Sequence, residues 1–585
     1  MKIDKRRWFF LGCIIFNLLV FGILCIWGNP TFATNDDYRM RLIISGRYTG
    51  QPSGNAVFMS YILGSMLAFL YRVSPDVEWY GIFTMISMYI PVCLCEYIFL
   101  KRTKRVKEFF ERLIVIAIFT FLILQKHILL PQFTITAAIW AMLAVAALIE
   151  IFNIYNTNKK FNKKWIVIFS ISCLFSCFIR KKIFYMCIPM LLLLLIINWQ
   201  KYRNIARRKF ILGIIGILCI IFVNEGAGML LNTNPQYKEF SDFNKARSSI
   251  YDYTGVPDYY ENEDFFVDIG FDGPAWENLN NRTFDISEDI NTEYLEKIYE
   301  YAKSTEDKSI IYKIWESFND IRSVLASKTL FFQVIAFIII LGIILHQRAW
   351  RLKRDANKIL IAYIIYIVIV VIGMAFIGRI MDRIIEALLF FVMGAAYASS
   401  SVSVYKKEDT WFSLGKFPIT NRLLVNIGLI CISFMTIIAN QYTLQRDESG
   451  IRGVVLERTN LLNSLTEYMN NKENDFLFYN ALDFISASEE VFTEKENQIL
   501  NIESLGNWNV FSPNYYERNK KYGFTSALEG LTECDNVYYA EIGEYHANIG
   551  DELAKKNMYL KCVDKIHVGD NTICVYKAEK NVEGD

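Results

Sequence analysis

The sequence predicts a mainly α-helical, polytopic membrane protein, in which a bundle of about eleven spans precedes a small C-terminal α/β domain outside the cytoplasm. Of the 585 residues, 53% are hydrophobic and the mean hydropathy is +0.23, which is high for a soluble protein. Apolar runs of the length that crosses a bilayer recur along the chain. The net charge of +2 hides a strong segregation of charge, and there is no basic stripe with interleaved aromatic residues. Nucleic acid is therefore not an expected partner.

The first apolar run, residues 8–28, follows Lys2, Lys5, Arg6 and Arg7 and predicts a first span with a cytoplasmic N-terminus. A signal peptide is the alternative, but no convincing cleavage site follows the run. Ten further runs predict the remaining spans. They lie near 78–100, 109–125, 131–153, 165–179, 183–199, 210–231, 329–346, 359–378, 384–404 and 423–440.

The distribution of lysine and arginine predicts the orientation of these spans. Four short segments, at 101–108, 154–164, 200–209 and 347–358, together hold 19 basic and two acidic residues. Strict alternation from a cytoplasmic N-terminus places all four segments inside. It places residues 232–322 outside, with 9 basic and 20 acidic residues, and the tail from residue 441 as well. We therefore expect a multi-pass protein of the plasma membrane.

One apolar segment, residues 56–72, conflicts with this alternation. Counting it as a span would place the basic 101–108 segment outside. We therefore expect a helix that lies in or dips into the outer interface, within a long extracytoplasmic loop at 29–77.

These counts predict four parts of the chain. They are a membrane module at 1–231, an acidic extracytoplasmic loop at 232–328, further spans at 329–440, and an extracytoplasmic α/β domain at 441–585. In the last part, the runs 475–479, 536–542 and 571–578 have the composition of strands.

The first candidate site is Thr34-Asn35-Asp36-Asp37, directly after the first span. Adjacent carboxylates at the outer face could supply a general base or hold a divalent cation. The residues that follow predict a short amphipathic helix lying on the membrane. The alternative is that Thr34 to Asp37 only cap this helix, because Thr and Asx residues favour helix N-termini and acids suit a first turn. The motif alone supports both interpretations about equally.

The second candidate is Arg180-Lys181-Lys182, which alternation places outside, at the mouth of a tight hairpin. Cations on this unfavoured side suit an anionic ligand such as a lipid phosphate. Contact with lipid headgroups, or a misassigned hairpin, is the alternative.

Further polar residues are predicted at the same depth and suggest a hydrophilic cavity that opens outward. Arg379, Asp382 and Arg383 lie in the connection between the ninth and tenth predicted spans. The alternative for Arg379 and Asp382 is that they form a purely structural ion pair. The remaining members of this set are Lys126, His127, Gln132 and Glu225.

The segment 243–265 of the acidic loop is dense in aromatic and carboxylate residues. This composition suits a sugar-binding surface, and it equally suits a packed extracellular cap, which is commoner. If the segment binds a ligand, Arg247, Tyr251 and Asp252 are the expected contacts.

Several stretches together resemble the multi-spanning GT-C glycosyltransferases, most closely a bacterial branch described as glucosyltransferase-like membrane proteins. The stretches are TNDD, SGRYTGQP, LYRVSPDVEWY and LLPQFTITAA, within about residues 8–230, and the tail segment GNWNVFSPNYYERNKKYGF. The sequence departs from better-known branches, since it has no WWD-type motif.

The resemblance implies an inverting transfer of a sugar from a polyprenyl-phosphate donor to a glycan or other acceptor of the cell envelope. It implies Asp36 or Asp37 as the base or as ligands of Mg²⁺ or Mn²⁺, and Arg180, Lys181, Lys182, Arg379 and Arg383 around the donor phosphate. Membrane lipids are further expected partners.

Two other classes of protein also fit the apolar runs. A transporter or flippase of lipid-linked glycans needs spans and cations, but ordinarily carries polar residues or broken helices at mid-membrane. A non-catalytic membrane protein with a working outer domain is the third possibility. The charged residues here cluster at span ends, which favours a site at the membrane surface.

Overall fold

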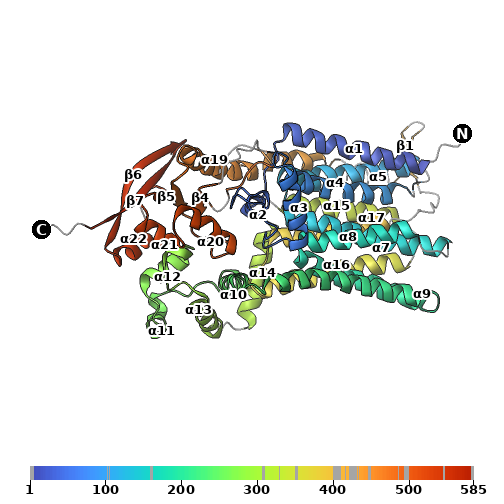
Figure 1. Cartoon of the computed structure of the whole chain (residues 1–585). Coiled ribbons are helices and arrows are strands. Elements are labelled where there is room, and N and C mark those ends of the chain that lie inside the picture. The colour runs from blue at the N-terminus through green and yellow to red at the C-terminus, as the bar shows by residue number, and fades with distance from the viewer. Residues whose placement is uncertain are drawn as a thin grey trace.

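The computed structural model describes residues 5–101, 103, 106–158, 162–305, 310–327, 330–348, 354–399, 410–414, 417–420, 431, 434–445, 450–484, 487–492, 500–543 and 547–581. Within these ranges the chain is mainly helical, and a five-stranded sheet lies in its C-terminal part. Figure 1 shows the long helices side by side in a bundle, with the sheet domain at one end of it. The predicted class, a helical membrane bundle with a small C-terminal α/β domain, is confirmed, whereas the number of spans and the side of the membrane stay predictions.

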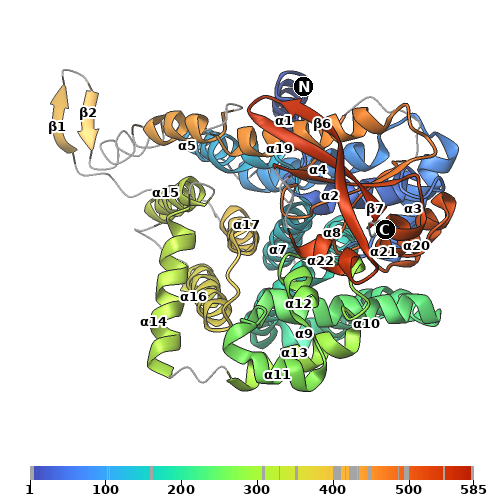
Figure 2. The ribbon, with the colours of Figure 1, turned by 90° about the vertical axis from the view of Figure 1, so that its left-hand side faces the viewer.

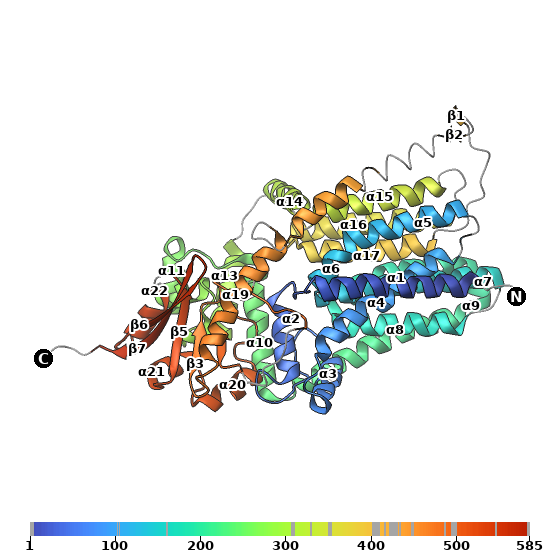
Figure 3. The ribbon, with the colours of Figure 1, turned by 90° about the horizontal axis from the view of Figure 1, so that it is seen from above.

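The helices of the bundle run roughly parallel or antiparallel to one another (Figures 1 and 3). Between α5 and α6 the helix widens into one π-helical turn, η1, Thr120–Leu124. The bundle helices are α1 Lys5–Trp27, α4 Trp79–Leu100, α5 Val106–Phe119, α6 Gln125–Leu129, α7 Phe133–Asn158, α8 Lys163–Ile179, α9 Lys181–Leu231, α15 Phe331–Arg348, α16 Arg354–Phe376 and α17 Asp382–Ser399.

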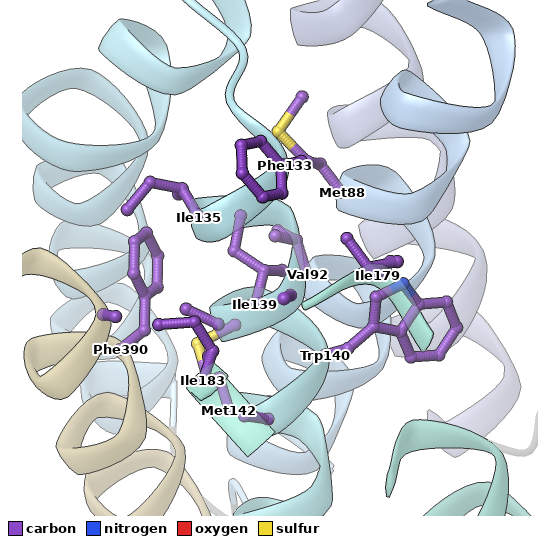
Figure 4. Packing of buried hydrophobic residues seen from close by; sticks show 14 of the residues in the cluster. Met88, Val92, Phe133, Ile135, Ile139, Trp140, Met142, Ile179, Ile183 and Phe390 are labelled. Atoms are coloured by element: carbon purple, nitrogen blue, oxygen red, sulfur yellow. The ribbon is translucent and has the colours of Figure 1, made fainter. Parts of the chain in front are cut away.

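Helix α7 is the centre of the bundle, because it contacts α4, α8, α9 and α17. Its residues 133–152 are all buried. Small residues in α7 and α17 allow close approach of the backbones. A Cβ atom on Gly394 of α17 would lie 2.2 Å from the carbonyl oxygen of Met142. Figure 4 shows the buried core around α7, with Phe390 and Trp140 on opposite sides of Ile139.

Helix α9 is hydrogen-bonded from Lys181 to Leu231, yet its two ends lie together. The Nζ of Lys181 is 2.9 Å from Oε2 of Glu225. In a straight helix these residues would be about 66 Å apart. The segment therefore reverses direction, and its two arms correspond to the predicted runs 183–199 and 210–231.

Five helices of the described chain are long and apolar enough to cross a membrane. They are Arg6–Trp27, Trp79–Leu100, Glu108–Leu129, Phe133–Tyr155 and Gly213–Leu231. Large apolar side chains on the outside of the bundle, such as Leu19 of α1 and Phe222 of α9, are more than half exposed. Such a surface is stable against lipid rather than water. The chain is a membrane protein.

The last predicted spans are described only in part. The run 384–404 begins as helix α17, and its residues from 400 onward lie outside the described residues. Of the run 423–440, residues 434–440 are helical and residues 423–430, 432 and 433 also lie outside. A short hairpin, β1 Thr410–Leu414 and β2 Phe417–Thr420, lies between the two runs.

Helices α4 and α7 end side by side, each at one of the basic segments of the sequence. The N-terminal end of α1 lies at the end away from the sheet domain (Figures 1 and 3). Lys101 at the end of α4 is 2.6 Å from Glu150 near the end of α7, so the chain enters two of the basic segments side by side. The predicted side of the membrane for this end remains a prediction.

Helix α3, Tyr61–Val73, corresponds to the apolar segment 56–72. Its 13 residues span about 20 Å, which is short for a bilayer core. One face packs inward through Leu63, Leu67 and Tyr71, while Met66 and Phe69 on the other face are exposed. This two-sided character fits the predicted interfacial helix.

The C-terminal part is a mixed α/β domain. Strands β3 Phe476–Tyr479, β5 Val537–Ile542 and β7 Asn571–Lys580 coincide with the three predicted strand runs. The sheet order is β4-β3-β5-β7-β6, in which β3 is parallel to β4 and β5, and β7 is antiparallel to β5 and β6. The other elements are β4 Ile502–Ser504, β6 Met558–Val568, α19 Ile451–Met469, α20 Pro513–Asn519, η5 Lys520–Tyr522, α21 Ala527–Glu533 and α22 Ala547–Ala554.

The acidic segment between α9 and α15 folds into short helices that share a hydrophobic core with the sheet domain. Phe243 and Phe284 of this segment belong to the same buried cluster as Phe476, Phe478 and Tyr515. Figure 2 shows its helices beneath the sheet. They are α10 Pro235–Ser249, η2 Ile250–Thr254, η3 Tyr260–Asn262, α11 Glu263–Ile269, α12 Gly273–Asn280, η4 Phe284–Ile286, α13 Thr292–Thr305 and α14 Ile310–Leu325.

Candidate functional site

Helix α2, Asn35–Ser45, carries the predicted acidic pair in its first turn. It differs from the expected helix on the membrane surface, because every residue from Asp37 to Ile44 is buried. The helix lies between the bundle and the sheet domain (Figure 3). Its two arginines are covered by the C-terminal part of the chain, where Arg39 pairs with Glu503 at 2.6 Å and Arg41 donates to the carbonyl oxygen of Glu490. The membrane-surface interpretation of α2 is therefore wrong.

Asp37 is wholly enclosed and its oxygens are occupied. Oδ1 accepts hydrogen bonds from the hydroxyl of Tyr80 at 2.9 Å and from the backbone N–H of Phe133 at 3.1 Å. The hydroxyl of Thr34 donates to Oδ2 at 3.3 Å. Burial raises the pKa of Asp37 to about 8. This residue ties α2 to α4 and α7, which is a positioning role.

Asp36 differs from Asp37, because it faces cations and its side chain is 17% exposed. Its Oδ2 lies 3.8 Å from Nη1 of Arg383. Burial raises the pKa of Asp36, while the charges of Arg383, Arg180 and Arg247 lower it in part. These three arginines come from three separate segments, so the fold gathers them around one carboxylate.

Arg180 lies in the tight connection between α8 and α9, as the sequence predicts. Its guanidinium is 4.9 Å from the ring centroids of both Phe58 and Phe133. Burial lowers the pKa of Arg180 to about 10, and the charge of Asp36 opposes that shift. No carboxylate lies within ion-pair distance of Arg180 in the described part of the chain. Arg180 is therefore held in place by aromatic rings and keeps its charge available.

The other two cations of the predicted triplet, Lys181 and Lys182, have different neighbours. Lys181 pairs with Glu225, which also accepts a hydrogen bond from Tyr185 at 2.5 Å. Lys182 is exposed and lies within the electrostatic field of Arg180 and Arg379. Lys182 therefore lies near Arg180, Arg379 and Asp252, whereas Lys181 joins the two arms of α9.

Arg379 lies in the turn between α16 and α17, directly after Gly378, whose φ of +73° suits glycine. Its Nη2 is 2.7 Å from Oδ2 of Asp252, and its guanidinium covers the ring of Tyr253. Asp382 instead accepts a hydrogen bond from Ser327 at 3.0 Å. Arg379 therefore joins the acidic segment to the bundle, beside Arg383.

The three residues chosen from the aromatic segment also have separate positions. Arg247 is hydrogen-bonded to Asn244 and lies over the ring of Phe284 at 5.8 Å. Tyr251 donates to the carbonyl oxygen of Leu279, and so packs within the acidic segment. Asp252 holds Arg379. Arg247 and Asp252 therefore contribute to the charged cluster, and Tyr251 supports it.

The predicted Lys126 and His127 lie inside the bundle. Lys126 Nζ is 2.5 Å from Oε1 of Glu386, and the ring of His127 is 3.2 Å from the amide of Gln333. Glu386 follows Arg383 in α17 by three residues, so this network lies about one turn deeper than Asp36. Gln132 is buried just before α7.

Sequence reasoning missed Trp508, which lies in the GNWN stretch of the sheet domain. Its indole N–H faces Asp36 and lowers the pKa of that carboxyl. The ring is 7% exposed, and the N–H has no acceptor at hydrogen-bond geometry among the described residues. Its ring centroid is 4.8 Å from that of Phe58, next to Arg180. The sheet domain thus supplies one wall of the site.

The residues around Asp36 do not fit a divalent cation. Both oxygens of Asp37 are occupied, and Asp36 faces three arginines, whose charge would repel a metal ion. In the described ranges no three His, Cys, Asp or Glu side chains gather as metal ligands. The cluster instead holds Arg180, Arg247, Arg379, Arg383 and Lys182 against Asp36 and Asp252, and suits an anion.

Comparisons with known proteins add little to this geometry. No family model and no curated protein matches the chain. Among solved structures, it is similar to the crystal structure of ArnT from Cupriavidus metallidurans bound to undecaprenyl phosphate. The similarity covers 97% of each chain at 8% sequence identity, with a TM-score of 0.38. At this level it carries no argument about function, which rests on the contacts described above.

Proposed function

We propose that this protein is a membrane glycosyltransferase that moves a sugar from a polyprenyl-phosphate donor to a cell-envelope acceptor on the outer face. One observation carries the proposal: Asp36 is the focus of Arg180, Arg247 and Arg383 at the end of an apolar bundle. A lipid-linked phosphate has the two features that such a place would recognise. Its tail is apolar like the bundle surface, and its headgroup is anionic.

The charge balance of the cluster supports a phosphate ligand. Five cations face two carboxylates, and Arg180 is without an ion-pair partner in the described chain. Arginine presents several N–H donors in a planar array that matches phosphate oxygens. A phosphate placed between Arg180 and Arg383 would compensate the excess positive charge.

Asp36 has the properties of a general base. Its raised pKa favours acceptance of a proton, and its remaining exposure leaves it open to an acceptor hydroxyl. In the proposed reaction, Asp36 takes the proton of that hydroxyl, and the oxygen forms a bond to the anomeric carbon. The bond from that carbon to the phosphate oxygen breaks, and polyprenyl phosphate leaves with its charge held by the arginines.

This single displacement inverts the anomeric centre, and needs no second carboxylate as nucleophile. Asp37, which is hydrogen-bonded to Tyr80 and Phe133, orients α2 so that Asp36 faces the cluster. The test is incubation of the purified protein with radiolabelled polyprenyl-phosphate sugars and envelope glycans. Transfer with inversion supports the proposal. If the protein binds polyprenyl phosphate but transfers sugar from none of the donors tested, the proposal is contradicted.

A further inference from the structure

A cavity of about 210 Å³ lies where the acidic segment meets the sheet domain. Its walls come from α10, from residues 285–292 and from the segments around α20 and α21, which lie close together in Figures 1 and 3. None of the residues that line it takes part in the proposed transfer.

The apolar wall of the cavity consists of aromatic rings at fixed angles. Phe243 and Phe511 stand edge to face with ring centroids 4.7 Å apart, and Tyr516 lies 6.5 Å from Phe511. Phe511 has a φ of +66°, an unfavourable conformation for a bulky residue. Strain of this kind persists where the surrounding structure requires it, often at binding sites. Here it keeps the ring of Phe511 in the cavity wall.

The polar wall carries acids and hydroxyl groups. Asp285 is 5% exposed, and its Oδ2 accepts hydrogen bonds from the Tyr515 hydroxyl at 2.5 Å and from the Ala527 N–H at 2.6 Å. Its Oδ1 has no donor among the described residues. Glu239 and Glu288 lie at the edge, and the described lining contains no Lys, Arg or His. Glu288 pairs with Lys556 at 3.3 Å, so Asp285 and Glu239 are the unpaired carboxylates of the described lining that would repel an anionic ligand.

The cavity is close to the cluster around Asp36. Phe243, in the cavity wall, contacts Phe284 at 6.1 Å, and Phe284 lies under the guanidinium of Arg247. Phe243 and Arg247 are one turn apart on α10, about 6 Å along its axis. A ligand in the cavity is thus separated from the cations of the transfer site by one layer of side chains.

We propose that this cavity binds a carbohydrate ring that carries no acidic group. The wall formed by Phe511 and Phe243 would cover one apolar face of the ring, and Asp285 and Glu239 would accept hydrogen bonds from its hydroxyl groups. An amino group on the sugar would be favoured by the carboxylates. The further step, that this sugar belongs to the acceptor, rests on the proposed transferase function.

The test is saturation-transfer NMR on the full-length protein in lipid nanodiscs, with methyl β-glucoside, glucosamine and glucuronic acid as probes. The glucoside and glucosamine should bind saturably, and glucuronic acid at least tenfold more weakly. Phe511→Gly removes the ring and suits the positive φ, so the fold is preserved and affinity should fall at least tenfold. Phe492→Ala, an exposed ring outside the cavity, is the matched control and should change nothing.

Equal affinity for glucuronic acid, or unchanged affinity in Phe511→Gly, would overturn the proposal. A second variant tests the charge argument, because Glu239 is exposed and tolerates replacement. Glu239→Lys should reverse the order of glucosamine and glucuronic acid, and an unchanged order would count against the site. Asp36→Asn separates the two proposals: it should abolish transfer and leave glucoside binding intact. If the wild type binds the glucoside but transfers no sugar, the transferase proposal is contradicted and the sugar-binding proposal is not.

Discussion

Arg39 of α2 donates a 2.6 Å hydrogen bond from Nη1 to Oε1 of Glu503, 464 residues further along the chain. Glu503 is completely buried, and it also accepts from Arg518 at 2.5 Å and from the hydroxyl of Tyr48 at 2.5 Å. These partners hold the pKa of Glu503 at about 2 despite its burial. The carboxylate thus joins the segment that follows α1 to the sheet domain.

Glu503→Gln should destabilise this joint. The substitution leaves two buried guanidinium groups without a counter-charge, and breaking a buried pair in this way costs roughly 3–5 kcal/mol. We expect a clearly lower midpoint of thermal unfolding for the purified protein. Glu293→Gln, at an exposed pair in α13, is the control and should leave the midpoint unchanged. Equal midpoints for the two variants would show that Glu503 does not join the domains.

Asp36→Asn should lower the rate of sugar transfer strongly, whereas Asp37→Asn should lower it little. Loss of a general base should lower the rate of sugar transfer by roughly 10²–10⁴-fold. Asparagine at 37 can still accept from Tyr80 and Phe133 and can donate to Thr34, so Asp37→Asn should retain most of the activity. The measurement is initial rate with radiolabelled donor. Full activity in Asp36→Asn would remove this residue from the mechanism.

Arg180→Gln and Lys181→Gln form a matched pair for lipid-phosphate binding. The two residues are adjacent, but Arg180 faces Asp36 whereas Lys181 pairs with Glu225. Loss of a charge-assisted contact should weaken binding of a polyprenyl phosphate about tenfold or more for Arg180→Gln. Lys181→Gln should bind nearly as the wild type does. If both variants lose affinity equally, general attraction to the membrane surface explains the effect better than a specific site.

The buried carboxyl of Asp37 should make stability depend on pH. Its pKa is about 8 in the folded protein and about 3.9 in an unfolded chain, so the folded state holds the proton more tightly. Stability from this group is therefore greatest at low pH and falls as the pH rises from about 4 to 8. Unfolding midpoints of Asp37→Asn, measured from pH 5 to 8, should fall less steeply than those of the wild type. The exposed Asp258→Asn serves as control, and parallel curves for all three proteins would contradict the assignment.

The proposed orientation can be tested through a native cysteine. Cys562 is exposed on β6 of the sheet domain, so an impermeant maleimide should label it in intact cells. Labelling should disappear in a variant with Cys562→Ser and Cys534→Ser. In that background, Lys163→Cys at the opposite end of the bundle should stay unlabelled until the cells are opened. Labelling of residue 163 in intact cells would contradict the proposed orientation.

Local patterns were sufficient to predict the elements that depend on neighbouring residues. The strand runs 475–479, 536–542 and 571–578 became β3, β5 and β7, and Arg180 lies in the expected hairpin. The partners of these elements depend on distant residues and could not be predicted. Arg379 pairs with Asp252 rather than with the nearby Asp382, because the acidic segment folds back onto the bundle.

The same reason explains what was missed at the site. Asp36 and Asp37 are adjacent and chemically alike in the sequence, and only their surroundings separate an enclosed carboxyl from an accessible one. Trp508 lies 472 residues beyond Asp36, and no local pattern connects the two. The cover over α2 is likewise made by β4 and by residues 488–491, at the other end of the chain.

The joint at Glu503 also constrains how the protein is made. Helix α2 leaves the ribosome early, and its arginines gain their counter-charge only when β4 has followed. At about 5–20 residues per second, 464 residues require roughly 20–90 s of synthesis. During that interval Arg39 is unpaired, and the wall that Trp508 forms beside Asp36 is absent. The cluster around Asp36 is therefore complete only after the last quarter of the chain has been synthesised and has folded onto α2.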